Sequence, residues 1–202
     1  MKPLIFIFLF LLSLVSCSSP SEEKKTTDSI SKTEEKETET PDSSLTYAII
    51  KERKSKPLGN LTLKKEVDSC IRESGDMQID EAVNSMLDLT KEHLNFSFGA
   101  TGEIPGRPLQ FNENCVGYAD FFNMLMNYLV EQKGWQKQYV CKHYVGKIYF
   151  DGTNLNALFK NDPFFKDHDF NVIKNLRGGN DIAVDPSLYE YLGMKRVALK
   201  NK

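Results

Sequence analysis

Apolar side chains recur at helical spacing from Cys115 to about Gln132, and this is the strongest structural pattern in the sequence. The predicted buried face and its apolar neighbours comprise Ala119, Phe122, Met126, Leu129, Tyr118, Leu125 and Tyr128. Gly134 follows as a typical helix stop. We therefore expect a largely buried helix that begins at Cys115.

A second helix and several strands are predicted around this one. Asp80 offers an N-cap for a helix that runs to about Leu94. Alternating apolar and polar residues at 45–51 and 60–67 indicate an antiparallel strand pair. Further strands are expected at residues 136–145, 147–150, 169–174 and 181–184, with turn residues at Gly146, Asp151-Gly152 and Gly178-Gly179. This pattern of helices followed by short strands with hairpin connections favours an α+β fold for residues 45–202.

The first residues are typical of an export signal. Met1 and Lys2 precede an apolar run over residues 4–15, which is long enough for a signal peptide and too short to span a bilayer. Leu14-Val15-Ser16-Cys17 then resembles the bacterial lipoprotein signal, in which cleavage leaves a lipid-modified cysteine at the N-terminus. The resemblance implies a signal peptide at 1–16, lipidation of Cys17 and a place in the bacterial cell envelope, on the periplasmic face or the cell surface. An ordinary secreted protein with a cysteine in its signal is the alternative.

Residues 17–44 are predicted to be a solvated tether. After Cys17 they are rich in Ser, Thr, Glu and Lys and contain a single apolar residue, Ile30, so they cannot bury enough surface to fold. The whole chain carries a formal charge of −2, and residues 45–202 are nearly neutral. A nearly neutral domain argues against nucleic-acid binding, which needs clustered basic charge.

Three cysteines remain once Cys17 is assigned to lipid. Disulfides persist in the compartment to which an exported chain goes, and an odd number leaves at least one thiol unpaired. We expect a bridge between Cys70 and Cys141, with Cys115 free.

Cys115 is a candidate nucleophile because it stands at the start of the predicted helix. The free N–H groups and the dipole of a helix N-terminus favour the reactive thiolate. The alternative is a small buried apolar residue, which is a common role for a free cysteine. Two later residues could complete a site: His168 opens one predicted strand, and Asp185 follows another. Neighbouring strands could hold His168 and Asp185 side by side and facing Cys115.

These residues resemble the transglutaminase-like superfamily. Residues 114–122 around Cys115, 168–172 from His168 and 184–187 around Asp185 are similar to its Cys, H-A-W-N-x-V and D-P-S/T blocks, in the same order. The likeness covers roughly residues 80–192. It implies a papain-like fold, in which the nucleophile's helix packs on an antiparallel sheet, and cleavage or transfer of amide acyl groups through a thioester.

Carried over by position, the resemblance makes Cys115 the nucleophile, His168 the general base and acid, and Asp185 the residue that orients the imidazole. Phe170 stands where the family usually has Trp, and residues 150–167 form a longer connection than is common. The Cys115 backbone N–H is the natural first oxyanion donor, and Gln110 is a weaker candidate for the second. A Gln110 that faces water is the alternative.

We expect a hydrolase rather than a transferase, because nothing in the sequence marks a second site for an amine. The substrate could be a protein, a peptide or a cell-wall peptide, and the lipid anchor would make the membrane a partner. A cell-wall endopeptidase and a non-catalytic binding lipoprotein on the same fold are the alternatives. The Cys141-Lys142-His143 segment holds too few ligands for a metal, and no glycine-rich phosphate loop follows a strand. We therefore expect no metal, cofactor, nucleotide or nucleic acid.

Overall fold

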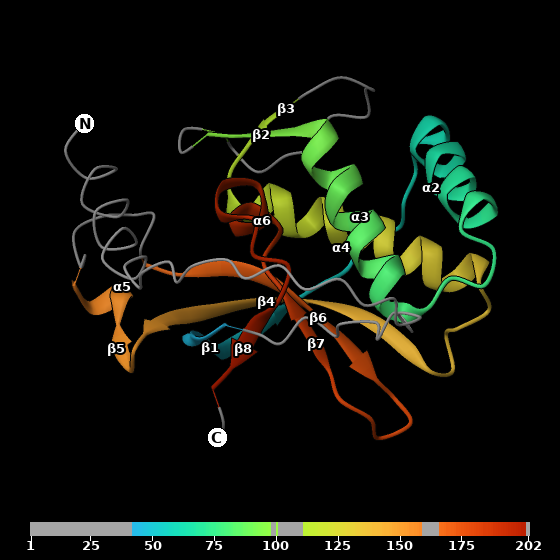
Figure 1. Cartoon of the computed structure of the whole chain (residues 1–202). Helices are drawn as coiled ribbons and strands as arrows, with labels where there is room; N and C mark the ends of the chain where they lie inside the picture. The colour runs from blue at the N-terminus through green and yellow to red at the C-terminus, as the bar shows by residue number, and fades with distance from the viewer. Residues whose placement is uncertain (1–41, 98–99, 101–110, 159–165, 201–202) are drawn as a thin grey trace, which may run out of the picture. The chain divides into compact units, whose positions relative to one another are not determined.

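A computed structural model describes residues 42–97, 100, 111–158 and 166–200 of the chain. This part is α+β, as the sequence predicts: five helices accompany a mixed six-stranded sheet and a separate two-stranded sheet. Figure 1 shows α2, α3, α4 and α6 on one side of the large sheet. The elements are β1 Asp42–Arg53, α2 Leu61–Glu73, α3 Ile79–His93, β2 Leu94–Phe96, β3 Phe111–Glu113, α4 Cys115–Gln132, β4 Tyr139–Phe150, β5 Thr153–Asn154, α5 Leu155–Leu158, β6 His168–Asn175, β7 Ile182–Val184, α6 Pro186–Leu192 and β8 Val197–Leu199.

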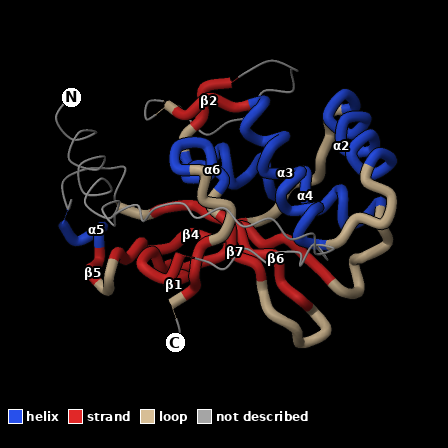
Figure 2. Tube along the Cα trace, in the orientation of Figure 1, coloured by secondary structure: helices blue, strands red, loops and turns tan. Residues whose placement is uncertain are grey.

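The strand order of the large sheet is β7-β6-β4-β1-β8, with β5 paired to β4. Figure 2 shows the strands of this sheet in red, with α3, α4 and α6 in blue above them. The pairs along this path are antiparallel except β1 with β8, which is parallel, so the sheet is mixed rather than purely antiparallel. The two end strands, β7 and β8, also contact each other. The sheet is therefore curled, and it encloses a small core of Leu45, Tyr47, Phe170, Val172, Ala183 and Val197.

The helix α4 runs from Cys115 to Gln132, which confirms the strongest sequence prediction. Asn114 caps it, because the side-chain oxygen of Asn114 accepts from the N–H groups of Val116 and Gly117. After the helix, Gly134 has a φ of 69°, a left-handed conformation that suits glycine. The helix packs between α2 and α3 on one side and β4 and β6 on the other, so most of its surface is buried.

The strand predicted at residues 60–67 is wrong, because this segment begins the helix α2. Asn60 caps the helix by accepting from the N–H groups of Thr62 and Leu63. Leu63 and Val67 lie one turn apart and are buried in the main core. The helix α3 starts close to its predicted position, but Gln78 rather than Asp80 occupies the N-cap and forms a capping box with Glu81.

The turn predicted at Gly146 is also wrong, since β4 runs unbroken from Tyr139 to Phe150. A Cβ at position 146 would lie 2.6 Å from the carbonyl oxygen of Ala48 and 2.8 Å from the ring of Phe170. Gly146 is therefore required by the close approach of β1 and of Phe170, not by a turn.

The N-terminal assignments lie mostly outside the described residues, including the signal peptide, Cys17 and nearly all of the tether. The strand β1 begins at Asp42, so the last residues assigned to the tether belong to the sheet. Gln110 also lies outside the described residues. In the part that the structure describes, no helix is long and apolar enough to cross a membrane.

Candidate functional site

His168 and Asp185 lie in contact at one end of the large sheet. His168 is the first residue of β6, and Asp185 follows β7 as the N-cap of α6. The ring Nε2 of His168 and Oδ2 of Asp185 are 2.5 Å apart, and both side chains are almost completely buried. The antiparallel pairing of β6 and β7 brings these two residues together although they are 17 positions apart.

The Asp185 carboxylate is held on both oxygens. Oδ1 accepts from the hydroxyl of Ser187 at 2.7 Å and from the N–H groups of Ser187 and Leu188 at 3.1 Å. Oδ2 accepts from His168 and from the hydroxyl of Tyr47 at 2.7 Å. Burial alone would raise the pKa of Asp185, but the charge of His168 and these hydrogen bonds lower it below its ordinary value. Asp185 is therefore an ionised, fixed acceptor.

Cys115 is the first residue of α4, and its thiol lies close enough to the ring of His168 for the two groups to interact electrostatically. Nε2 of His168 faces Asp185, which leaves Nδ1 as the ring nitrogen that can serve the thiol. Burial would lower the pKa of His168, yet the negative charge of Asp185, the interaction with Cys115 and the hydrogen bond to Asp185 raise that pKa well above its ordinary value. The structure thus brings Cys115, His168 and Asp185 into one site.

The N-terminus of α4 supplies one candidate donor for an oxyanion. The Asn114 side chain accepts from the amides of Val116 and Gly117, and it does not engage the amide of Cys115. The Cys115 N–H therefore remains at the helix start, next to the sulfur. The second expected donor, Gln110, is not among the residues that the structure describes.

Tyr47 is a site residue that the sequence analysis missed. It lies on β1, is fully buried, and packs its ring 4.8 Å from that of Phe170. Burial raises the pKa of Tyr47, and the charge of Asp185 and the hydrogen bond to it raise it further, so its hydroxyl remains a donor. A tyrosine at an alternating strand position is a signal for burial, and a buried hydroxyl needs a partner, but the sequence does not identify that partner.

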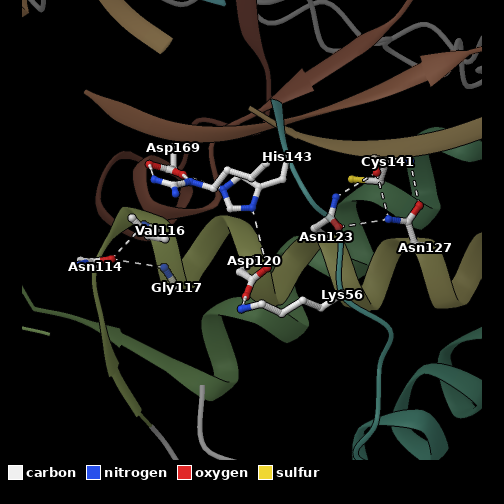
Figure 3. A network of polar contacts seen from close by, with 11 residues as sticks. Lys56, Asn114, Val116, Gly117, Asp120, Asn123, Asn127, Cys141, His143 and Asp169 are labelled. Carbon is white, nitrogen blue, oxygen red and sulfur yellow. Dashed lines mark hydrogen bonds and ion pairs between the residues drawn. The ribbon is translucent and has the colours of Figure 1, made fainter. Parts of the chain in front are cut away.

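A second buried network, which the sequence analysis also missed, lies between α4 and the large sheet (Figure 3). His143 on β4 is almost fully buried, with Nε2 2.8 Å from Oδ1 of Asp169 on β6 and Nδ1 3.8 Å from Oδ1 of Asp120 on α4. Burial would lower the pKa of His143, but the two carboxylates raise it above its ordinary value. Asp169 directly follows His168, and Asp120 lies on the helix of Cys115, so His143 ties together the two elements that carry the site.

Two cations complete this network. Lys56 donates to Oδ2 of Asp120 at 2.6 Å, and Arg53 donates to both oxygens of Asp169 through Nε and Nη2. Burial would raise the pKa values of Asp120 and Asp169, but the interaction of each carboxylate with His143 and the hydrogen bonds from the two cations lower both. Both carboxylates are therefore ionised.

The predicted disulfide between Cys70 and Cys141 is not formed: both are free thiols, as is Cys115. Cys70 lies on α2, which packs against α4, and Cys141 lies on β4 beneath α4. The backbone of Cys141 is bonded to the side chains of Asn123 and Asn127 on α4. The helix therefore stands between the two sulfurs. Burial raises the pKa of both thiols, which makes each a poor nucleophile.

Other candidate sites are less well equipped. Among the described residues, no group of three or more His, Cys, Asp or Glu side chains is arranged to hold a metal ion. A surface hollow near the opposite end of α4 from Cys115 is lined by Met77, Trp135 and Tyr139 among others, and it contains no cysteine or histidine. The arrangement around Cys115 is therefore the better candidate for chemistry.

Comparisons with known proteins identify no relative: no family model, no curated protein and no solved structure matches the chain. The candidate site therefore rests on its own geometry.

Proposed function

We propose that this protein is a cysteine-dependent enzyme that cleaves amide bonds through a thioester on Cys115. The observation that carries the proposal is the buried His168–Asp185 pair, with 2.5 Å between Nε2 and the carboxylate, together with Cys115 at the start of α4 within electrostatic reach of the same imidazole. A nucleophile, a base and a residue that orients the base are the three parts that such catalysis needs. Hydrolysis is favoured over transfer, because nothing on the described surface marks a site for an acceptor amine.

The reaction would proceed in two halves. His168 takes the thiol proton, and the sulfur of Cys115 attacks the amide carbonyl carbon, with the Cys115 N–H bonded to the developing oxyanion. The imidazolium then gives its proton to the amine nitrogen as the C–N bond breaks, which leaves a thioester. In the second half His168 takes a proton from water, and the hydroxide adds to the thioester carbonyl. The C–S bond then breaks, the sulfur of Cys115 regains its proton from His168, and the free acid leaves. Asp185 stabilises the imidazolium throughout without receiving its proton.

The proposal extends to a papain-like fold of the transglutaminase-like type. It is supported by the order of Cys115, His168 and Asp185 along the chain and by the packing of α4 on β4 and β6. The signal-like N-terminus further supports a lipid anchor on Cys17 and a location in the bacterial cell envelope. Its substrates there would be proteins, peptides or cell-wall peptides.

A non-catalytic binding protein is the second candidate, and one observation favours it. Cys115 is only 6% exposed, and a buried thiol can be a core residue without reactivity. The two candidates differ in the reactivity of the sulfur, since a structural thiol reacts slowly.

Alkylation of the full-length protein with iodoacetamide at neutral pH tests the proposal. We expect Cys115 to react at least about tenfold faster than a thiol in an unstructured peptide, because a thiolate is the reactive form. His168→Ala should slow the labelling of Cys115 by about tenfold or more, whereas Cys70→Ser, which removes the partly exposed thiol on α2, should leave it unchanged. Mass spectrometry of the Cys115 peptide gives the rate at this thiol alone. Equal rates for Cys115 and the peptide would favour the binding protein.

A further inference from the structure

Arg53 and Lys56 are anchored cations whose carboxylate partners lie on the two elements that carry His168 and Cys115. Arg53 is the last residue of β1, and it pairs with Asp169, which directly follows His168 on β6. Lys56 follows β1 in the chain and is paired with Asp120, five residues after Cys115 on α4. The two carboxylates are buried, but the cations reach solvent: the side chains of Arg53 and Lys56 are 39% and 63% exposed.

Arg53 and Lys56 each pair with one carboxylate, and His143 lies between the two carboxylates, with Nε2 2.8 Å from Asp169 and Nδ1 3.8 Å from Asp120. The carboxylates raise the pKa of His143, which favours a further positive charge on the buried side of this network. Arg53 and Lys56 are the members of the network that solvent reaches, so a ligand would meet the positive charge of the network there.

Arg53 also has unused hydrogen-bonding capacity. A guanidinium has five N–H donors, and Arg53 uses one at Nε and one at Nη2. Asp169 is its only hydrogen-bond acceptor in the part of the chain that the structure describes. The remaining N–H groups are held in a fixed plane, and this geometry suits bidentate recognition of a carboxylate.

The guanidinium lies within electrostatic reach of Cys115. The pKa of Arg53 is raised mainly by its hydrogen bonds to Asp169, and the charges of Asp169, Cys115 and Asp120 also contribute. Glu113 is the acidic residue nearest the nucleophile in sequence, but its buried carboxylate packs against Gly117 of α4. Glu52, the exposed carboxylate that precedes Arg53 on β1, is paired with Lys142.

We propose that Arg53, assisted by Lys56, binds a carboxylate of the substrate close to the amide that Cys115 attacks. This rests on the proposed function and narrows its substrate class to acidic peptides or other amides with a nearby carboxylate. The cations would hold the anionic group while the carbonyl carbon meets the sulfur, which raises the rate through positioning.

Iodoacetate and iodoacetamide form a matched pair of probes for this site. They alkylate the same sulfur and differ in whether the acyl group is a carboxylate or a neutral amide. The quantity to measure is the rate ratio of iodoacetate to iodoacetamide at Cys115 of the full-length protein, at low ionic strength. We expect Arg53→Gln to lower this ratio about threefold to tenfold, because one nearby positive charge is lost, with a smaller decrease for Lys56→Gln. The iodoacetamide rate should stay within about twofold, which also shows that the variant is folded.

Lys142→Gln is the matched control. Lys142 lies on β4, is 33% exposed and is likewise paired with a carboxylate, that of Glu52, and within the described residues its side chain bonds to no member of the His143 network. Its loss should leave the ratio unchanged. A ratio that is equal in the wild type, Arg53→Gln and Lys56→Gln would overturn the carboxylate site while leaving Cys115 a reactive thiol. If Arg53→Gln does not fold, Lys56→Gln decides alone. A Cys115 that reacts with neither reagent overturns the proposed function and this inference together.

Discussion

Asp185 accepts more hydrogen bonds than any other side chain of the site, and its donors come from three different elements. His168 comes from β6, Tyr47 from β1, and Ser187 from the helix that Asp185 itself caps. A buried carboxylate is costly unless its oxygens are satisfied, so these donors are what permit an ionised Asp185 inside the protein. The same bonds fix the direction in which it holds the imidazole.

Replacing Tyr47 by Phe tests whether the Tyr47 hydroxyl helps to stabilise the buried Asp185 carboxylate. The change removes the hydroxyl that donates to Oδ2 of Asp185 and keeps the ring that packs on Phe170. We expect the free energy of unfolding, measured in urea, to fall by roughly 1–3 kcal/mol because a buried charged acceptor loses a donor. Tyr144→Phe is the control, since its ring also packs near Phe170. Its hydroxyl makes no hydrogen bond within the described residues. Equal losses in the two variants would contradict the assigned role of the Tyr47 hydroxyl.

At the scale of elements, the first turn of α4 positions the nucleophile, and Asn114 stabilises that turn. The Asn114 side chain accepts from two amides of the helix and also donates to the carbonyl of Ala100. We expect Asn114→Ala to lower the free energy of unfolding by about 1 kcal/mol. It should also slow iodoacetamide labelling of Cys115 by roughly threefold or more, because a frayed first turn no longer holds the sulfur against His168.

Asn60→Ala provides the comparison for this prediction. Asn60 caps α2 with the same two-amide geometry, far from the site in sequence. Its loss should cost a similar free energy, also about 1 kcal/mol, and leave the labelling rate at Cys115 unchanged. If both variants slowed labelling equally, the effect would reflect general stability rather than the position of the sulfur.

The sequence predicted some elements well and others poorly, for physical reasons. The helix from Cys115 was predictable because a long run of apolar residues fits only the helical period. The segment 60–67 was not, because Leu63 and Val67 are four apart and satisfy both a helix turn and a two-residue alternation. Leu61 completed the apparent alternation, although it is 73% exposed in the structure. The turn prediction at Gly146 failed because the sequence does not distinguish a glycine that leaves room for a neighbouring strand from one that forms a turn.

At the scale of the whole molecule, the site depends on contacts between residues far apart in the chain. The strand order β7-β6-β4-β1 places β1, which carries Tyr47 and Arg53, close enough to reach Asp185 and Asp169 on the other side of β4. The sequence indicated Cys115, His168 and Asp185 through their local motifs. It did not indicate Tyr47 or the His143 network, because their partners are set by strand order and register, which no local pattern specifies.

The His143 network joins four elements of the molecule, β1, β4, β6 and α4, and its charge makes that junction sensitive to pH. The pKa of His143 is raised in the folded state, from an ordinary value of 6.5, once the two carboxylates outweigh the effect of burial. A raised pKa means that the folded state binds the proton more tightly, so this stabilisation is complete below about pH 6.5 and is lost as the pH rises through the folded value. Asp120 and Asp169 have lowered pKa values, so their contribution is present above their ordinary value of 3.8 and is lost as the pH falls through the folded values.

His143→Gln should therefore change how stability depends on pH, as well as its size. From pH 6 to pH 9 we expect the wild type to lose stability with a steeper slope than the variant, by up to about 1.4 kcal/mol per pH unit for one proton. His168 also has a raised pKa and contributes to the slope of both proteins, so the difference between them isolates His143. Urea unfolding at each pH measures both slopes. Parallel curves, offset by a constant free energy, would mean that His143 is neutral in the folded protein and joins the elements through uncharged hydrogen bonds alone.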